Sequence, residues 1–146
     1  MELKFKIYAK IQKPLDEVFD AVYNPRKLEK YFTTRSASGY LDEGATVVWE
    51  WAYYPIPYEV HVKKLVKNEL IAFEWVSHDG STTTRVEFGF ERLSENETKV
   101  SIAESGWEES EAGLKNSYDN CSGWTHFLCA LKVFVENGMN LSDSFY

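Results

Sequence analysis

Hydrophobic and polar residues alternate along several short stretches of the chain, which is the pattern of half-buried β-strands. In the first stretch, Leu3, Phe5 and Ile7 share one face while charged residues occupy the other. Between residues 36 and 105 five further groups share a face: Val47, Trp49, Trp51 and Tyr53; Val60 and Val62; Ile71, Phe73 and Trp75; Val86, Phe88 and Phe90; Val100, Ile102 and Glu104. Short strands of this kind predict a curved antiparallel sheet of six or seven strands.

Residues that favour turns separate these runs. They occur at residues 42–44, 55–57, 67–69, 78–80 and 94–97. The turn at 55–57 is predicted from the sequence Pro-Ile-Pro, and the turn at 78–80 would contain His78. Each turn therefore joins neighbouring strands of one meander.

Two regions have helical spacing instead. Pro14 opens the first, in which Leu15, Val18 and Val22 recur on one side until Asn24 and Pro25 end it, and residues 25 to 31 predict a second short helix. The other region, near the C-terminus, predicts a long helix from about 112 to 137, which Asn137-Gly138 ends. Its apolar stripe comprises Cys121, Trp124, Phe127, Leu128, Leu131, Phe134 and Val135.

This order of elements predicts an α+β fold in one domain, residues 1–146. One face of the sheet is apolar, and only the helices can cover it. We expect the long C-terminal helix to lie across the concave face of the sheet, with a crevice where the two surfaces diverge.

Composition narrows the possible functions. The hydrophobic fraction of 44% is that of a globular protein, and the aromatic fraction of 16% supplies rings for a core or a pocket. The net charge of -7 disfavours binding to nucleic acid or to anionic membranes. No stretch approaches the roughly 20 apolar residues of a membrane span.

The two cysteines favour a reducing compartment. Cys121 and Cys129 are separated by eight residues of the predicted helix, a rise of about 12 Å. A disulfide needs Cα atoms within roughly 7 Å, so these two cannot pair. Because the first residues also lack the apolar run of a signal peptide, we expect a cytoplasmic protein.

Several segments resemble one known family. They are Ile11, Pro14, Val18-Phe19, Ala21, Pro25 and Leu28 at the front; 70–75, ending in Phe-Glu-Trp; 98–100 and 104–107; and Gly123-Trp124, Leu128, Leu131 and 136–138 in the helix. Their order and spacing resemble the activator of heat-shock-protein-90 ATPase homologue family, within the START-like (SRPBCC) helix-grip superfamily. The resemblance implies the helix-grip fold over nearly the whole chain. Relatives include co-chaperones, binders of lipids and other hydrophobic ligands, and some cyclases.

Six residues are predicted to line a pocket between the helix and the sheet: Trp51, Trp75, Phe88, Glu104, Trp124 and Leu128. Glu104 is the candidate polar anchor, because alternation turns it inward with Val100 and Ile102. A buried carboxylate would have a raised pKa and could act as an acid, a base or a ligand anchor. The alternative is a carboxylate in water at the end of the strand. For the tryptophans, the alternative is packing in the core.

Other chemistry finds no support in the sequence. His61, His78 and His126 do not converge by spacing, and neither cysteine has an obvious base beside it. We expect neither a metal site nor a cofactor. The acidic run from Glu104 to Glu111 could dock a basic partner, but it fits a solvated loop before a helix better.

Three functions remain. The first is a binding protein for an apolar or aromatic, lipid-like molecule held in the crevice. The second is a co-chaperone-like regulator of the heat-shock-protein-90 ATPase, which rests on the family resemblance. The third is a cyclase or hydrolase in which Glu104 supplies the acid or base.

Overall fold

A seven-stranded antiparallel sheet forms the body of the protein, with strand order β1-β7-β6-β5-β4-β3-β2. The computed structural model describes residues 1–77 and 79–146. The strands are β1 (Lys4–Ile11), β2 (Ser36–Ala37), β3 (Thr46–Trp51), β4 (Tyr54–Val66), β5 (Leu70–Val76), β6 (Thr83–Ser94) and β7 (Glu97–Ser105). The helices are α1 (Leu15–Tyr23), α2 (Pro25–Leu28) and α3 (Glu111–Asn137).

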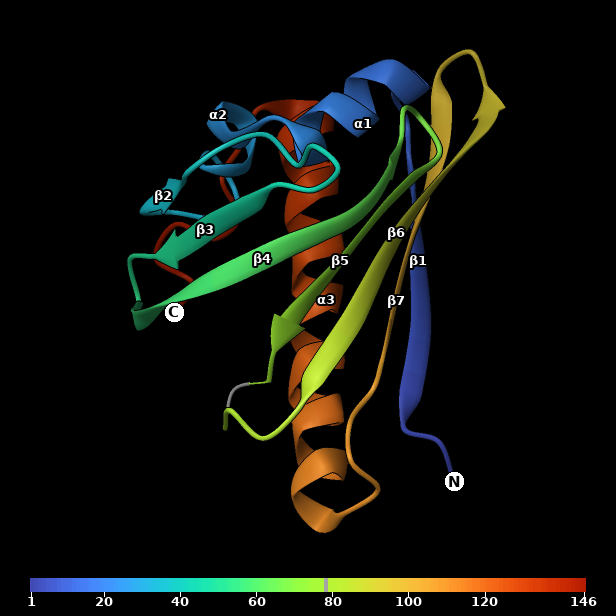
Figure 1. Ribbon diagram of the computed structural model, residues 1–146. Coiled ribbons are helices and arrows are strands. Elements are labelled where there is room, and N and C mark those ends of the chain that lie inside the picture. Colours follow the sequence, from blue (N-terminus) through green and yellow to red (C-terminus); the bar gives the residue numbers. More distant parts are fainter. Residues whose placement is uncertain (78) are drawn as a thin grey trace.

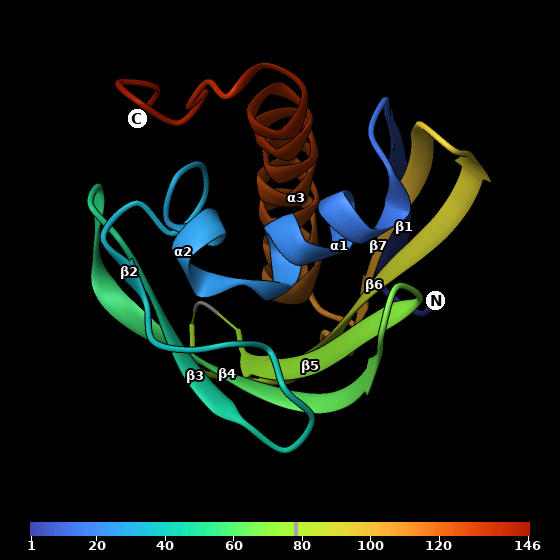
Figure 2. The same cartoon turned by 90° about the horizontal axis from the view of Figure 1, so that it is seen from above.

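The sheet curves around the long helix, as predicted. Figure 1 shows α3 running behind the sheet, and Figure 2 shows the sheet wrapping around it, with α1 and α2 near one end of the helix. This arrangement is the α+β helix-grip fold. Within the described ranges, no helix combines the length and the apolar content needed to cross a bilayer.

Local sequence explains how α3 begins and ends. The Ser110 side chain accepts a hydrogen bond from the Gly113 backbone N–H at 3.1 Å, which caps the first turn. Gly138 ends the helix in the left-handed conformation (φ 70°), which glycine adopts without steric cost. The helix is therefore fixed at both ends of the predicted segment.

The pairing of β7 brings Glu104 to the concave side. In the register of the sheet, Glu104 lies opposite Phe5 of β1 and Val86 of β6. Along β7, Thr98, Val100, Ile102 and Glu104 are all buried, and the residues between them are half-buried. The strand thus directs one carboxylate onto the same buried face as Val100 and Ile102.

Two sequence predictions about the elements were wrong in detail. Residues 55–57 do not form a turn but belong to β4, and the chain reverses at residues 52–53 instead. Proline lacks a backbone donor, and Pro55 and Pro57 stand where the pairing of β3 and β4 is irregular, between Trp49 and Trp51. The second short helix ends at Leu28 and continues only as turns. The predicted position of His78 lies outside the described residues.

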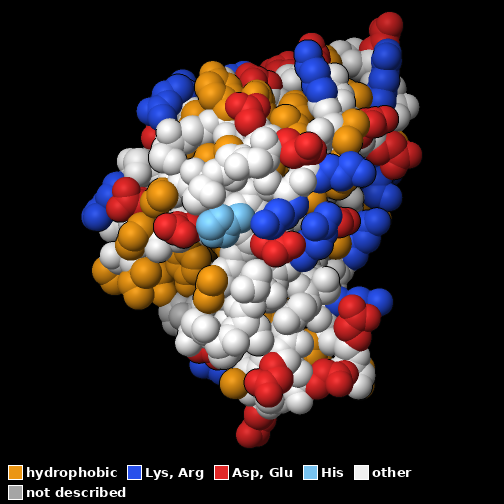
Figure 3. Space-filling view, viewed as in Figure 1, with side chains coloured by type: hydrophobic (Ala, Val, Ile, Leu, Met, Phe, Trp, Pro, Cys, Tyr) orange, Lys and Arg blue, Asp and Glu red, His pale blue; other side chains and the backbone are white. Residues whose placement is uncertain are grey.

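The outer face of the sheet differs from the inner one. Figure 3 shows Lys and Arg mixed with Asp and Glu over much of this face. Hydrophobic side chains gather on the left of the view, over the hairpin that joins β3 and β4. Exposed members of this hairpin include Tyr53 and Ile56. The convex face is therefore ordinary charged surface, whereas the hairpin carries apolar side chains outward.

Candidate functional site

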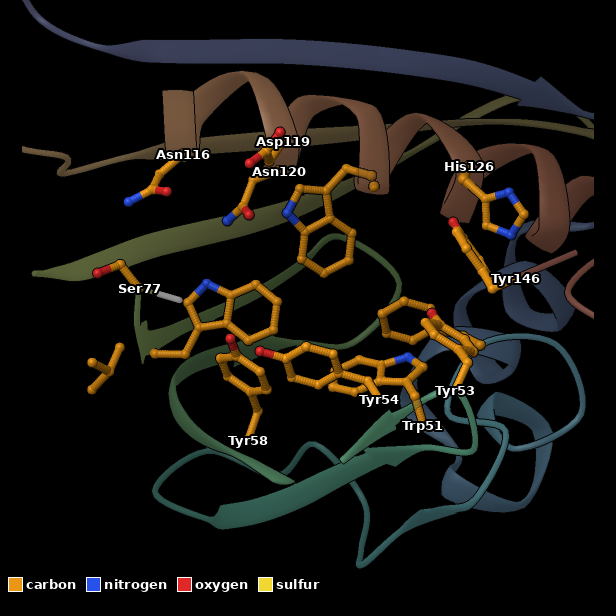
Figure 4. Close-up of a pocket in the computed structure, with 15 residues that line it drawn as sticks. Trp51, Tyr53, Tyr54, Tyr58, Ser77, Asn116, Asp119, Asn120, His126 and Tyr146 are labelled. Carbon is orange, nitrogen blue, oxygen red and sulfur yellow. The ribbon is translucent and has the colours of Figure 1, made fainter. Parts of the chain in front are cut away.

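A pocket of about 300 Å³ opens between α3 and the strands β3, β4 and β5. Most of its wall is aromatic: Phe32, Trp51, Tyr53, Tyr54, Tyr58, Trp75, Trp124, His126 and Tyr146. Val76, Ser77, Asn116, Asp119, Asn120 and Gly123 complete the lining. In Figure 4, Asn116 and Asn120 extend from α3 while Trp51, Tyr54 and Tyr58 face them from the strands.

The aromatic wall is continuous from the helix to the sheet. The rings of Trp75 and Trp124 are stacked, with centroids 5.5 Å apart and an interplanar angle of 29°. The ring centroids of Tyr58 and Trp75 are 5.4 Å apart, and those of Trp51 and Tyr58 are 5.8 Å apart. Centroid separations in this range are those of favourable aromatic pairs. The wall therefore holds its own shape through ring contacts.

Glu104 lies directly behind this wall and is only 1% exposed. Its Oε2 accepts hydrogen bonds from Trp75 Nε1 at 3.0 Å and from Thr84 Oγ1 at 2.7 Å. Its Oε1 accepts from Trp124 Nε1 at 2.8 Å, and Asn120 Nδ2 lies 3.1 Å from both oxygens. Four side chains from three elements thus converge on one carboxylate.

Burial and hydrogen bonding act in opposite directions on this carboxyl group. Burial raises the pKa of Glu104 above its ordinary value of 4.5, and the hydrogen bonds from Trp75, Thr84, Trp124 and Asn120 lower it, with burial the larger effect. No salt bridge involves Glu104 among the described residues. The group is therefore stabilised by neutral donors alone, which is the arrangement expected for a structural anchor of the two indoles.

One end of the pocket is polar. Ser77, Asn116, Asp119 and Asn120 gather there, as Figure 4 shows. Asn116 Nδ2 donates to Asp79 Oδ2 at 3.0 Å, and Asp79 also accepts hydrogen bonds from Ser77 and Ser81. These hydrogen bonds hold the pKa of Asp79 well below its usual range. This end therefore carries negative charge and amide groups.

The C-terminal segment borders the other end of the pocket. The ring of Tyr146 stacks on Tyr53 with centroids 4.3 Å apart and lies 5.2 Å from the His126 ring. Burial lowers the pKa of His126 and raises that of Tyr53 to about 12. Both side chains are consequently uncharged at neutral pH.

The six predicted lining residues fall into three groups. Trp51, Trp75 and Trp124 line the pocket. Glu104 lies one layer behind it, so the alternative of a carboxylate in water at the strand end is wrong. Phe88 is fully buried in the core against Trp124, and Leu128 faces β1, where it lines a separate hollow.

Sequence reasoning missed the tyrosines and the amides. Tyr53, Tyr54 and Tyr58 follow two tryptophans within ten residues, and this density of rings was the available signal. The incorrectly predicted turn at 55–57 separates Tyr58 from the other rings and so obscures this signal. Asn116 and Asn120 are four residues apart and so share a face of the predicted helix, a spacing that could have been noticed.

The described residues contain no group of three or more His, Cys, Asp or Glu side chains suited to a metal ion. Cys121 is half-buried and Cys129 exposed, and both are free thiols. What the site offers is an aromatic cavity with one polar end and a rigid buried anchor.

Comparison with solved structures shows how widely this architecture is shared. A protein from Staphylococcus saprophyticus is 24% identical, with a TM-score of 0.75 over 94% of this chain and 96% of that one. The Aha1 dimer of Colwellia psychrerythraea is 21% identical, with a TM-score of 0.75 over 92% and 97%. DynU16, a protein of the dynemicin biosynthetic locus, is 18% identical, with a TM-score of 0.80 over 95% of this chain and 49% of its own. At these identities the likeness establishes the fold.

No curated protein sequence matches the chain. A family model, described as activator of Hsp90 ATPase homolog 1-like protein, matches residues 12–136. That range begins just after β1 and ends in the last turn of α3. It includes every strand except β1 and every residue that lines the pocket except Tyr146. By this match, the chain belongs to the activator of Hsp90 ATPase homolog 1-like family.

Proposed function

We propose that the protein binds an apolar or aromatic small molecule in the pocket between α3 and the sheet. The observation that carries this proposal is the pocket itself, because its wall is built from rings contributed by four elements (β3, β4, β5 and α3) and by three segments outside them. Natural ligand pockets are concave, mostly apolar and equipped with a few polar groups, and their volumes begin at about 300 Å³. Here the amides and Asp119 would orient the ligand.

Burial of the ligand's apolar surface would drive binding. A molecule that hides about 200 Å² of apolar surface gains roughly 5 kcal/mol before the losses of ordering and desolvation. The ring-to-ring contacts and the hydrogen bonds to Glu104 reduce the reorganisation that binding requires. A gain of this size corresponds to a dissociation constant of about 0.2 mM before those losses, so micromolar binding would also need the polar contacts at the end of the pocket.

The geometry favours binding over catalysis by Glu104. Both oxygens of this carboxylate are occupied by donors from Trp75, Thr84, Trp124 and Asn120, and Glu104 is absent from the pocket lining. A general acid or base must come within hydrogen-bond reach of the reacting atom. We therefore assign Glu104 the role of positioning the two indoles.

A co-chaperone-like role is the second candidate, because the family description and the Aha1 neighbour both point to it. It would act through the outer surface and would not need the pocket. Addition of the protein to a heat-shock-protein-90 ATPase assay separates the two proposals. Stimulation that survives blockage of the pocket would favour this second role.

We further propose that the protein works in the cytoplasm. The two free thiols, Cys121 and Cys129, suit a reducing compartment.

Titration with lipids, flavonoids and other apolar compounds, followed by tryptophan fluorescence, tests the binding proposal. At least one compound should produce a saturable change, since three of the five tryptophans line the pocket. Tyr58→Ala should weaken that binding by about tenfold through loss of a ring contact. Tyr8→Ala removes a ring that is 62% exposed on β1 and serves as the control. Unchanged emission across the panel would count against the proposal.

A further inference from the structure

The charged side chain that lines the pocket is acidic. No Lys or Arg is among the described residues that line it, and Asp119 is its single charged lining residue. Asp79 lies one hydrogen bond away through Asn116, and Glu104 lies one hydrogen bond behind Asn120. An arrangement of this kind creates a negative potential in a cleft, and low-dielectric walls concentrate it.

The aromatic wall adds to this preference. Ring faces carry the negative part of the aromatic quadrupole, and tryptophan attracts cations most strongly. Trp75 and Trp124 both donate their indole N–H groups to the Glu104 carboxylate, at 3.0 and 2.8 Å. Such hydrogen bonds polarise the donor and leave more electron density on the ring. The two rings are stacked on each other, so the buried carboxylate strengthens the attraction for positive charge only on the indole surface that is left facing the pocket.

A negatively charged ligand would meet the opposite situation. A carboxylate that leaves water for this pocket would lose its hydration without gaining a cationic partner. His126 does not compensate, because burial keeps its ring neutral near pH 7. The pocket is therefore poorly suited to fatty acids despite its apolar walls.

We propose that the pocket selects an organic cation, namely a protonated amine or quaternary ammonium group carried on an apolar or aromatic body. The ammonium would lie near Asp119 and the indole of Trp124, and the apolar body would extend along Tyr58 and Trp51. This inference rests on the proposed binding function and names the class of ligand for that same pocket. It also explains why a buried carboxylate lies behind two indoles that could have packed without one.

Three ligands of similar shape test the inference: benzyltrimethylammonium, its uncharged isostere neopentylbenzene, and phenylacetate. Binding is followed by NMR titration of the tryptophan indole N–H signals. We expect the cation to bind at least tenfold more tightly than the isostere and phenylacetate to show no saturable shift. Asp119→Asn should lower the ratio of the two affinities by about threefold and should weaken its dependence on salt. Asp16→Asn, an exposed site on α1, should leave that ratio unchanged.

The outcomes separate this inference from the proposed function. If neopentylbenzene or phenylacetate binds as tightly as the cation, the charge selection is overturned while the pocket remains a binding site. If none of the three ligands shifts an indole signal while a compound of the fluorescence panel binds, the charge selection is overturned and the binding function stands; if the whole panel also fails, both proposals are overturned. The ratio of the affinity for the cation to that for neopentylbenzene should fall in the variants. If it is unchanged in both Asp119→Asn and Glu104→Gln, the electrostatic basis is overturned. Using a ratio keeps the result independent of small structural changes in the variants.

Discussion

Trp75 of β5 and Trp124 of α3 stack on each other with centroids 5.5 Å apart, and both indole N–H groups point to the same carboxylate, Glu104. The pair joins the sheet to the helix at the wall of the pocket. Because each ring is held by a hydrogen bond as well as by stacking, neither can rotate freely. The shape of the wall therefore depends on a residue that does not line it.

The hydrogen bond from Trp124 should be measurable as stability. Trp124→Phe keeps a ring in place but removes the donor to a buried carboxylate, a loss of roughly 1.5–3 kcal/mol. Trp107→Phe is the matched control, because Trp107 is also buried but its Nε1 has no hydrogen-bond partner in the structure. In urea unfolding, Trp124→Phe should lower the free energy of unfolding by at least about 1 kcal/mol more than Trp107→Phe. Equal losses would contradict the proposed anchoring.

Glu104 should make stability depend on pH in a specific direction. Its pKa is raised above 4.5 in the folded protein, so the folded state binds its proton more tightly than the unfolded state does. The stabilisation is complete below pH 4.5 and is lost as the pH rises through the raised pKa, by at most about 1.4 kcal/mol per pH unit.

Glu104→Gln isolates this effect. The free energy of unfolding of the wild type, minus that of the variant, should decrease between pH 4.5 and pH 8. Denaturant unfolding at several pH values gives this difference, and Glu95→Gln, on the exposed turn between β6 and β7, provides the control. A difference that grows with pH would mean that the hydrogen bonds outweigh burial.

A second buried hydrogen bond ties α1 to the chain after α2. Tyr31 is fully buried, and its hydroxyl donates to the Ala21 carbonyl at 2.9 Å. Tyr31→Phe should therefore cost about 1 kcal/mol of unfolding free energy. Tyr118→Phe, at a position 66% exposed on α3, should change stability by less than about half of that amount. Comparable effects at the two positions would contradict the role of this bond.

Most of the fold could be predicted because alternation and helical spacing are local signals. The inward face of β7 and the stripe of α3 around Trp124 follow from the period of the pattern alone. The turn at 55–57 was wrong because proline signals a turn in general but is tolerated in a strand where the pairing is irregular. The structure replaces that turn with a strand that carries Tyr54 and Tyr58.

The candidate site was less predictable because its parts converge from distant segments. Alternation turned Glu104 inward but left its surroundings open, since its donors are 16 to 29 residues away in the sequence. The same alternation could not distinguish Phe88, in the core, from Trp75, at the pocket. That distinction depends on where the helix diverges from the sheet, which no local pattern records.

Gly123 offers a way to close the pocket without disturbing the core. This residue lines the pocket, and a Cβ added to it would meet no atom within 4 Å. Because glycine is unfavourable inside a helix by roughly 1 kcal/mol relative to alanine, Gly123→Ala should stabilise α3. Gly123→Phe should also fold, but its ring would occupy the space that a ligand needs.

The most direct measurement is titration of N-phenyl-1-naphthylamine, an uncharged fluorescent probe, into the wild type, Gly123→Ala and Gly123→Phe. We predict saturable binding to the wild type and to Gly123→Ala, and at least tenfold weaker binding to Gly123→Phe, with all three proteins folded. Equal binding to all three would place the probe elsewhere on the protein. That result, or no binding to the wild type by this probe or any other apolar ligand, would contradict a ligand pocket between α3 and the sheet.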